Sequence, residues 1–304
     1  MQQLNLLIMS KQNKLNINPL LAHKNSLGEG PVWDPETNRL YWVDIKGGEV
    51  HWSTWGSINH SSFTFDEPVS AVALTTQTDI IVCARPSGLY FFDLNSQNSR
   101  KIHELEPTKP GNRPNDGAVD SSGRFWIGTM EDAETAACGS LFSAHNQVLT
   151  HHLGNLGISN GIGWNKASTT MYLTDSMQRT IWQFDFDETD GVLSNQQPFA
   201  IVAADAGFPD GLCVDDEDNI WSAHWDGYRI TQYASNGDIL NVYPVPVPRP
   251  TACTFAGPEL DQLVITSASY GLTAKEIHEH PLSGQTLLMP TQTHGKPANR
   301  VPYA

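Results

Sequence analysis

One pattern recurs six times along the chain and constrains the fold more than any single motif. Each copy opens with a small residue and an apolar strand, continues through a polar turn, and ends in a second strand rich in aromatic residues. The copies begin at Gly30, Ser70, Gly117, Gly161, Gly211 and Ala252. Their starts lie 40 to 50 residues apart, which is the period of a β-propeller blade. The repeat therefore indicates a ring of similar units.

Each copy is followed by a third strand with period-2 alternation, such as "GLYFFDL" (88–94) and "YRITQYA" (228–234). Turn signals such as Asn236-Gly237 then lead to a fourth strand. Six copies predict a six-bladed β-propeller with four antiparallel strands per blade. The alternative, a β-sandwich, has no fixed period of this length. We expect residues 17–304 to form this single domain, residues 1–16 to be an extension, and the segment "LNINPLLAHK" (15–24) to supply the outer strand of the last blade.

Composition limits the partners of such a ring. The formal net charge of −15 argues against nucleic acid and anionic membranes. The sequence has no apolar run of membrane-spanning length, and "LNLLIM" (4–9) is too short for the core of a signal peptide. The four cysteines form no Cys-x-x-Cys pair, which favours a reduced, cytoplasmic setting. A small molecule or a metal ion is the partner that remains.

The first strand of each propeller blade lines the central channel, so equivalent repeat positions converge on one mouth. The residues at or beside the position before each small residue are Glu29, Val69, Asn115-Asp116, Asn160, Asp210 and Thr251. Four of these six positions offer a carboxylate or amide oxygen. Oxygen donors without His or Cys favour Ca²⁺, Mg²⁺ or Mn²⁺. Taken singly, Asp-Gly and Asn-Gly are also ordinary turn dipeptides.

Several motifs in a fixed order resemble the senescence marker protein/gluconolactonase/luciferin-regenerating enzyme family. They are "LGEGPVWD", "RPNDGAVDSSGRFWIGTM", "SNGIGW", "YLTDS" and "FPDGLCVDDEDNIW", and the resemblance runs over residues 27–273. It implies a six-bladed propeller, in agreement with the repeat count. It also implies an enzyme that hydrolyses lactones of aldonic acids with the help of a divalent metal ion.

The resemblance assigns roles residue by residue. Glu29, Asn160 and Asp210 match the metal ligands of the family, and Asp210 also matches the proposed general base. Arg113 and Asn115 match residues that contact substrate. Ca²⁺ is the expected ion, with Zn²⁺, Mn²⁺, Mg²⁺ and Fe²⁺ as alternatives. A hydroxide bound to the metal is the alternative to Asp210 as the group that activates water.

The chain departs from the family pattern after "GTM", where it reads Glu131-Asp132-Ala133. A substrate-binding acid of the family has no aligned counterpart here, and we expect Glu131, or else Asp132, to replace it. Trp225 and Tyr270 are candidates for the walls of the substrate site, because both follow second strands in their repeats.

Three interpretations compete. The first is a metal-dependent lactonase whose partner is a small sugar lactone, present as a monomer or weak homodimer. The second is a phosphotriesterase-like hydrolase on the same fold, and the third is a calcium-binding regulatory propeller, as the family's animal member regucalcin was first regarded. Arg113 and Asn115 beside three metal-binding oxygens favour an enzyme, because a calcium store needs neither residue.

Overall fold

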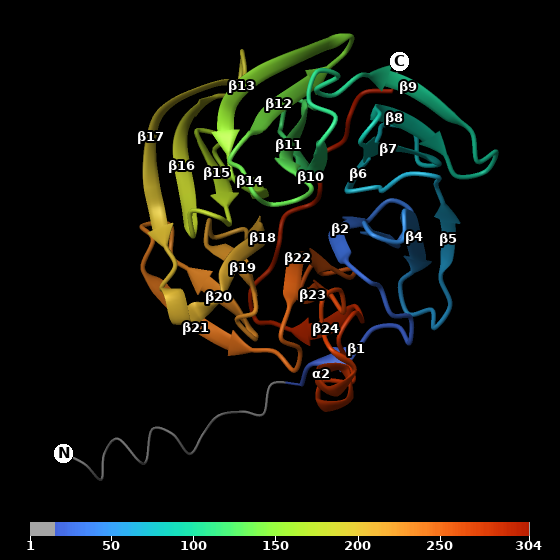
Figure 1. The fold of residues 1–304 in the computed structure, drawn as a ribbon, viewed down its shortest axis with the longest axis vertical. Helices are drawn as coiled ribbons and strands as arrows, with labels where there is room; N and C mark the ends of the chain where they lie inside the picture. Colours follow the sequence, from blue (N-terminus) through green and yellow to red (C-terminus); the bar gives the residue numbers. More distant parts are fainter. Residues whose placement is uncertain (1–15, 304) are drawn as a thin grey trace.

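A computed structural model describes residues 16–303 as six four-stranded antiparallel sheets arranged in a closed ring (Figure 1). The prediction of a six-bladed β-propeller is confirmed. The expected N-terminal extension, apart from Asn16, lies outside the described residues. Among the described residues, no helix is long and apolar enough to cross a membrane.

The first three blades follow one another along the chain. Blade I comprises β2 (Gly28–Asp34), β3 (Arg39–Asp44), β4 (Glu49–Thr54) and β5 (Ser61–Thr64). Blade II comprises β6 (Ala71–Leu74), β7 (Ile80–Arg85), β8 (Gly88–Asp93) and β9 (Ser99–His103). Blade III comprises β10 (Asn112–Val119), β11 (Phe125–Glu131), β12 (Gly139–His145) and β13 (Val148–Leu156).

The last three blades complete the ring. Blade IV comprises β14 (Ser159–Trp164), β15 (Thr170–Asp175), β16 (Thr180–Asp187) and β17 (Val192–Ile201). Blade V comprises β18 (Phe208–Val214), β19 (Ile220–Trp225), β20 (Arg229–Tyr233) and β21 (Ile239–Pro244). Blade VI comprises β22 (Pro250–Ala256), β23 (Gln262–Ser267), β24 (Leu287–Pro290) and β1 (Asn18–Pro19). Two short helices, η2 (Ala204–Ala206) and α2 (Ala274–Glu279), lie in the connections.

The ring closes through its N-terminal segment. Strand β1 pairs antiparallel with β24, with Asn18 opposite Leu288 and Pro19 opposite Leu287. This confirms the prediction that residues 15–24 supply the outer strand of the last blade. The closure removes the free edge that an open ring would leave on blade VI.

The core lies between neighbouring sheets, where the aromatic second strands pack. The largest fully buried side chains include Trp33, Trp42, Trp126 and Trp221. Each such tryptophan typically contributes on the order of 3–5 kcal/mol to stability. The alternation of apolar residues that marks the repeat in the sequence is therefore the pattern that holds the blades together.

β-Bulges shape the inner strands next to the channel. The register of β2, β10, β14, β18 and β22 shifts at the repeated position, for instance between Glu29 and Val32 and between Pro209 and Leu212. A bulge re-aims the side chain beside it. Gly30 adopts a positive φ of 51° in its bulge, and a Cβ on Gly161 would lie 2.8 Å from the carbonyl oxygen of Asp210. The small residue thus permits the turn in blade I and the close approach of neighbouring strands in blade IV.

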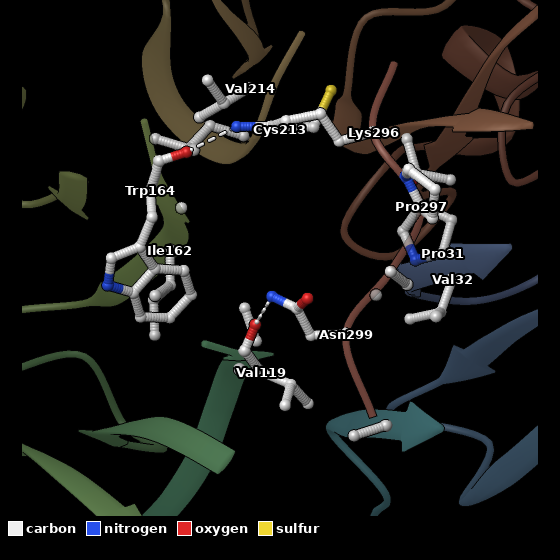
Figure 2. Close-up of a pocket in the computed structure, with 18 of the residues that line it drawn as sticks. Pro31, Val32, Val119, Ile162, Trp164, Cys213, Val214, Lys296, Pro297 and Asn299 are labelled. Carbon is white, nitrogen blue, oxygen red and sulfur yellow. Dashed lines mark hydrogen bonds between the residues drawn. The ribbon is translucent and has the colours of Figure 1, made fainter. Parts of the chain in front are cut away.

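The C-terminal segment 291–303 crosses the other mouth of the channel (Figure 1). Lys296 Nζ donates to the carbonyl oxygen of Trp164 at 2.8 Å, and Asn299 Nδ2 donates to that of Val119 at 3.1 Å. Figure 2 shows this segment beside the ends of the inner strands, around a cavity of about 310 Å³. One mouth of the channel is therefore spanned by the chain itself, and the predicted site lies toward the opposite mouth.

Candidate active site

A second cavity, of about 370 Å³, opens at that opposite mouth. Its lining includes Glu29 from β2, Arg113 and Asn115 from β10, Asn160 from β14 and Asp210 from β18. All five side chains are at most 8% exposed. The structure thus brings together the residues that the repeat register and the family resemblance selected from four different blades.

A chain of hydrogen bonds orients the amides of this cavity. Arg113 Nη1 donates to Asn115 Oδ1 at 2.6 Å, and Asn115 Nδ2 donates to Asn160 Oδ1 at 2.8 Å. Asn160 Nδ2 donates in turn to Ser176 Oγ at 2.8 Å, and Ser176 Oγ donates to the carbonyl oxygen of Pro209 at 2.6 Å. The amide oxygen of each asparagine therefore accepts a hydrogen bond from the preceding residue of this chain, and the bonds fix the positions of both side chains.

The carboxylates of the channel carry unfavourable electrostatics. Burial, and then the charge of Asp116, raise the pKa of Glu29 to about 8. Burial raises the pKa of Asp116 to about 6. Burial, followed by the charges of Glu29 and Asp116, raises the pKa of Asp210 well above its usual range. Glu29 and Asp210 are buried acids of this cavity that repel each other and the nearby Asp116, so the cavity favours a cation.

The donor set fits a hard divalent ion. Glu29 and Asp210 offer carboxylate oxygens and Asn160 offers an amide oxygen, and no His or Cys lines the cavity among the described residues. Ions such as Ca²⁺, Mg²⁺ and Mn²⁺ take oxygen ligands of this kind. Asp116, whose Oδ1 accepts the N–H of Gly117 at 2.7 Å, closes its own turn and adds charge nearby.

The rim of the cavity combines apolar walls with two cations. Trp225 and Tyr270 line the cavity, as expected for walls, together with Phe208 and Met177. Arg249 lies over the ring of Trp225 at 4.6 Å from its centroid, and Lys46 lies 5.2 Å from the centroid of Tyr270. Such walls exclude water from one side of a ligand, and the cations attract anionic or oxygen-rich groups.

Glu131 does not line the cavity. Its Oε2 accepts hydrogen bonds from Thr135 N, Thr135 Oγ1 and Ala136 N, so the carboxylate closes the loop that follows β11. Asp132 lies closer to the site, because its Oδ1 accepts from Arg113 Nε at 2.6 Å and from Lys46 Nζ at 3.0 Å. The structure therefore gives no support to Glu131 as a substrate contact and places the alternative acid beside Arg113.

Four other cavity residues were assigned no site role from the sequence. They are Lys46, Glu134, Arg249 and Ser176, the last residue of the "YLTDS" motif. Lys46 and Ser176 come just after the second strand of their repeats, and that position faces the same mouth as the start of the first strand. This shared position is the signal that the sequence offered for them. Glu134 and Arg249 lie in connections whose course the repeat does not specify.

His224, Asp44 and Asp175 contact the backbone and have structural rather than catalytic roles. His224 is 1% exposed, and its Nδ1 lies 2.9 Å from the carbonyl oxygen of Ala206, away from the cavity lining. Asp44 accepts the backbone N–H groups of Ser26 and Leu27 at 2.6 and 3.0 Å. Asp175 accepts that of Gly157 at 2.9 Å. Such residues hold the connections between blades.

Comparisons with known proteins agree with this geometry. The family model described as the SMP-30/Gluconolactonase/LRE-like region matches residues 27–269. The L-arabinolactonase of Azospirillum brasilense is 32% identical over 276 residues, which cover 90% of this chain and 91% of that protein. Regucalcin of Danio rerio is 31% identical over 281 residues, which cover 90% and 94% of the two chains. The crystal structure of a calcium-binding protein, regucalcin, from Agrobacterium tumefaciens superposes with a TM-score of 0.91 at 27% identity and covers 94% of this chain and 97% of that one. The chain belongs to the SMP-30/gluconolactonase/LRE-like family.

Proposed function

We propose that the protein is a metal-dependent sugar lactonase that opens an aldonolactone to the aldonic acid. The observation that carries the proposal is the convergence of Glu29, Asn160 and Asp210 with Arg113 and Asn115 in one buried cavity. Family members named as lactonases, at about 32% identity, support the same reaction class. The cavity of about 370 Å³ has the size of a small-ligand pocket.

The metal ligands in this proposal are Glu29, Asn160 and Asp210. Ca²⁺ is our first choice of ion because it prefers oxygen ligands and because a calcium-binding protein is among the structural neighbours. Zn²⁺, Mn²⁺, Mg²⁺ and Fe²⁺ are the alternatives. When bound, the ion supplies positive charge for the lactone carbonyl oxygen, where negative charge develops during hydrolysis.

The chain's own residues bind the sugar and move the proton. Arg113 presents a planar set of donors for the sugar oxygens, and its contacts with Asn115 and Asp132 hold that plane in place. Asp210 takes a proton from water as the water oxygen attacks the carbonyl carbon. The ester C–O bond of the ring then breaks, and the alcohol oxygen that leaves takes the proton back. One water is consumed, and one aldonic acid is formed.

The place of Asp210 in the cavity, beside Glu29 and Asn160, suits this role. Burial raises the pKa of Asp210 in the metal-free protein, and a bound cation would oppose that effect and favour the charged carboxylate that accepts the proton. Trp225 and Tyr270 then form the walls that limit the access of further water to the reacting ester. We include a cytoplasmic location and a monomeric or weakly dimeric state in the proposal, and the four free cysteines support the former.

The test is proton release from a panel of glucono-, galactono-, xylono- and arabinono-lactones and one phosphotriester. The wild type is measured as prepared, after chelation with EDTA, and after return of Ca²⁺, Mn²⁺ or Zn²⁺. We expect chelation to abolish lactone opening, and one of the ions to restore it. Asp210→Ala is compared with Asp190→Asn, a change in an exposed turn of blade IV.

Each outcome separates the competing functions. Undiminished hydrolysis after chelation and in Asp210→Ala would rule out the metal mechanism. Turnover of the phosphotriester alone would favour the phosphotriesterase-like enzyme. Tight Ca²⁺ binding without turnover of any ester would favour the calcium-binding regulatory protein.

A further inference from the structure

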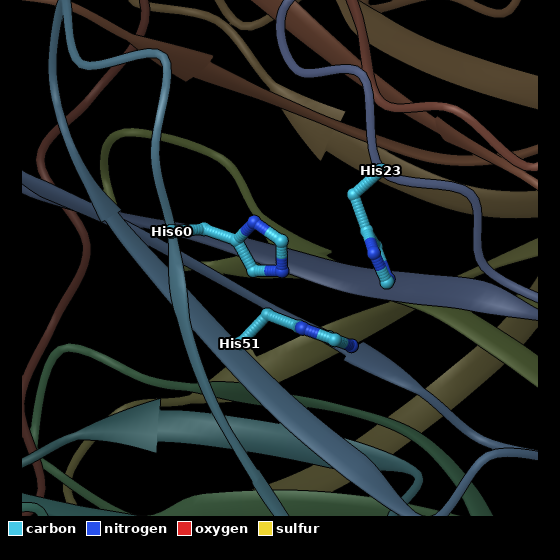
Figure 3. A group of neighbouring side chains, drawn as sticks. All are labelled: His23, His51 and His60. Atoms are coloured by element: carbon cyan, nitrogen blue, oxygen red, sulfur yellow. The ribbon is translucent and has the colours of Figure 1, made fainter.

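Three histidines meet at the joint between the first and last blades. His23 lies in the segment that leads from β1 to β2, His51 lies on β4, and His60 directly precedes β5. Their ring centroids are 4.6 Å apart for His23 and each of the other two, and 5.3 Å apart for His51 and His60. Figure 3 shows the three imidazoles turned toward one another. None of them lines the cavity at the channel mouth.

Packing, rather than hydrogen bonding, holds the central ring of this group. His51 is 0% exposed, and neither of its ring nitrogens has a hydrogen-bond partner. The nearest carboxylate oxygen in an ion pair, Glu49 Oε2, is 3.4 Å from His51 Nε2. Trp42 stacks on His51 with ring centroids 5.1 Å apart and planes 12° apart. His23 Nε2 is also buried without a partner. Buried polar atoms without partners are rare in native proteins, and a bound water or ion is one explanation for them.

We propose that His23, His51 and His60 bind one transition-metal ion, with Zn²⁺ as the representative ion. One ligand nitrogen from each residue lies within 4.8 Å of the other two. For such a triangle, a point exists no more than about 2.8 Å from all three nitrogens, so shifts of less than about 1 Å would give zinc–nitrogen distances of 2.0–2.1 Å. Imidazole nitrogens suit Zn²⁺, Cu²⁺ and Ni²⁺, unlike the oxygen donors of the channel.

The surroundings complete such a site. Burial, and then the neighbouring His23 and His60, lower the pKa of His51 to about 3, so at neutral pH the ring is uncharged and offers a lone pair. The Glu49 carboxylate is near enough to serve as a fourth ligand or to accept a proton from His51. The uncharged His51 ring and the Glu49 carboxylate leave negative charge at this place, which a divalent cation balances.

The site has a structural consequence at the ring closure. Strand β1 has two residues and two register pairs with β24. His23 follows this strand, whereas His51 and His60 belong to blade I. A bound ion would therefore join the closing segment to the first blade and strengthen the point where the ring is held by the fewest backbone pairs.

The experiment counts Zn²⁺ ions on the full-length chain, stripped of metal and then saturated with Ca²⁺ so that the oxygen site is filled. Equilibrium dialysis compares the wild type with His60→Gln and His23→Gln, because both side chains are only partly buried and their replacement leaves the core intact. The matched control is His278→Gln, on the exposed surface of α2. We expect the wild type and the control to bind one more Zn²⁺ per chain than either variant. Zinc at about 100 times its Kd should raise the wild-type Tm by roughly 5 °C more than that of His60→Gln.

Equal zinc counts and equal Tm shifts in all four proteins would overturn the proposal and leave the cluster as aromatic packing. If either variant fails to fold, Co²⁺ added to the calcium-saturated wild type decides the question. Intense visible bands of four-coordinate, nitrogen-bound Co²⁺ would support the site, and a weak six-coordinate spectrum would refute it. Because the channel site is filled with Ca²⁺ throughout, the result does not depend on whether the protein is a lactonase.

Discussion

Two aspartates on one inner strand show how the propeller treats buried charge in two ways. Asp210 lies near the start of β18, and Asp215 directly follows its end. Both are buried, at 5% and 0% exposure. Asp215 accepts four hydrogen bonds of 2.8–3.0 Å, from Glu217 N, Asn219 N, Asn219 Nδ2 and Trp221 Nε1. Asp210 instead faces the like charges of Glu29 and Asp116, which together with burial raise its pKa.

The contrast repeats in other blades. On β2, Glu29 lies near the start of the strand and Asp34 is its last residue. Asp34 accepts hydrogen bonds from Glu36 N and Thr37 Oγ1. Asp120, after Asp116 on β10, accepts Ser122 N, Arg124 N, Arg124 Nε and Trp126 Nε1. The far ends of the inner strands thus carry carboxylates whose donors come from the protein. At the open mouth, Glu29 and Asp210 carry carboxylates that are left for a ligand, which is the usual cost of a functional site in stability.

The largest expected effect of breaking this contrast is on activity. Asp210→Asn keeps the shape of the side chain and removes its ability to take a proton and its charge toward the metal. We expect kcat/KM for a lactone to fall by at least about a thousandfold, equivalent to about 4 kcal/mol of barrier. The metal-free variant should be no less stable than the wild type, because one of three repelling carboxylates is gone. Initial rates and urea unfolding measure the two effects, and a stable variant with near-normal rates would contradict the proposed role.

The partner residue on the same strand should respond in the opposite way. Asp215→Ala leaves the backbone N–H of Asn219 and the Trp221 indole N–H buried without their acceptor, and it also removes the acceptor of the Glu217 N–H. We expect the free energy of unfolding to fall by roughly 3–4 kcal/mol. The kcat of the folded fraction should stay within about twofold of the wild type, since the residue lies away from the cavity lining. A large loss of kcat without a loss of stability would refute the division between the two ends of the strand.

Burial should disfavour the charged form of a histidine in the blade body, as it does for the buried acids. Burial lowers the pKa of His224 to about 4, and its Nδ1 contact with Ala206 opposes this only in part. Between about pH 6.5 and pH 4 the unfolded chain binds a proton that the folded chain does not, so the free energy of unfolding falls as the pH falls, by up to about 3 kcal/mol. His224→Asn should remove up to one proton from the slope of stability against pH, and an unchanged slope would show that His224 takes no part.

The blades and the cluster of Glu29, Asn160 and Asp210 could be predicted from the sequence, because both follow the repeat. The six strand starts gave the six blades, and the residue before each small residue identified Glu29, Asn160 and Asp210 as neighbours. The bulges explain why this succeeded, since the same local distortion aims each of these side chains into the channel. The closing strand also followed from the fold, because a ring of six sheets requires one.

Features without a repeat could not be predicted in this way. The loop after β11 turns Glu131 away from the cavity and brings Glu134 to it, and such loop geometry depends on contacts outside the repeat. The C-terminal segment crosses the channel by isolated contacts, such as the side-chain bond of Lys296 and the single backbone bridge between Val301 and Thr75, which leave no periodic pattern. His23, His51 and His60 come from separate segments, and their spacing matches no metal-binding motif.

The smallest expected effect concerns Arg113. This residue lies at the open mouth, but other groups of the protein accept its hydrogen bonds. Its Nε donates to Asp132, and its Nη1 donates to Asn115 and to the carbonyl oxygen of Pro114. In Arg113→Lys a single ammonium group cannot hold Asp132 and Asn115 at once and still present a planar face to a sugar. We expect KM for the lactone to rise about tenfold, or 1.4 kcal/mol, with a smaller fall in kcat.

Arg249→Lys is the matched control for this prediction, because Arg249 lies at the rim of the same cavity and its Nε pairs with Asp226. It should change KM by no more than about threefold, since Asp226 is exposed and solvent weakens its ion pair with Arg249. Equal effects of the two changes would mean that positive charge at the mouth, rather than the geometry that Arg113 imposes on Asn115, governs substrate binding. A selective effect of Arg113→Lys would show that hydrogen bonds within the protein can prepare a binding group at the same mouth where the carboxylates are left for a ligand.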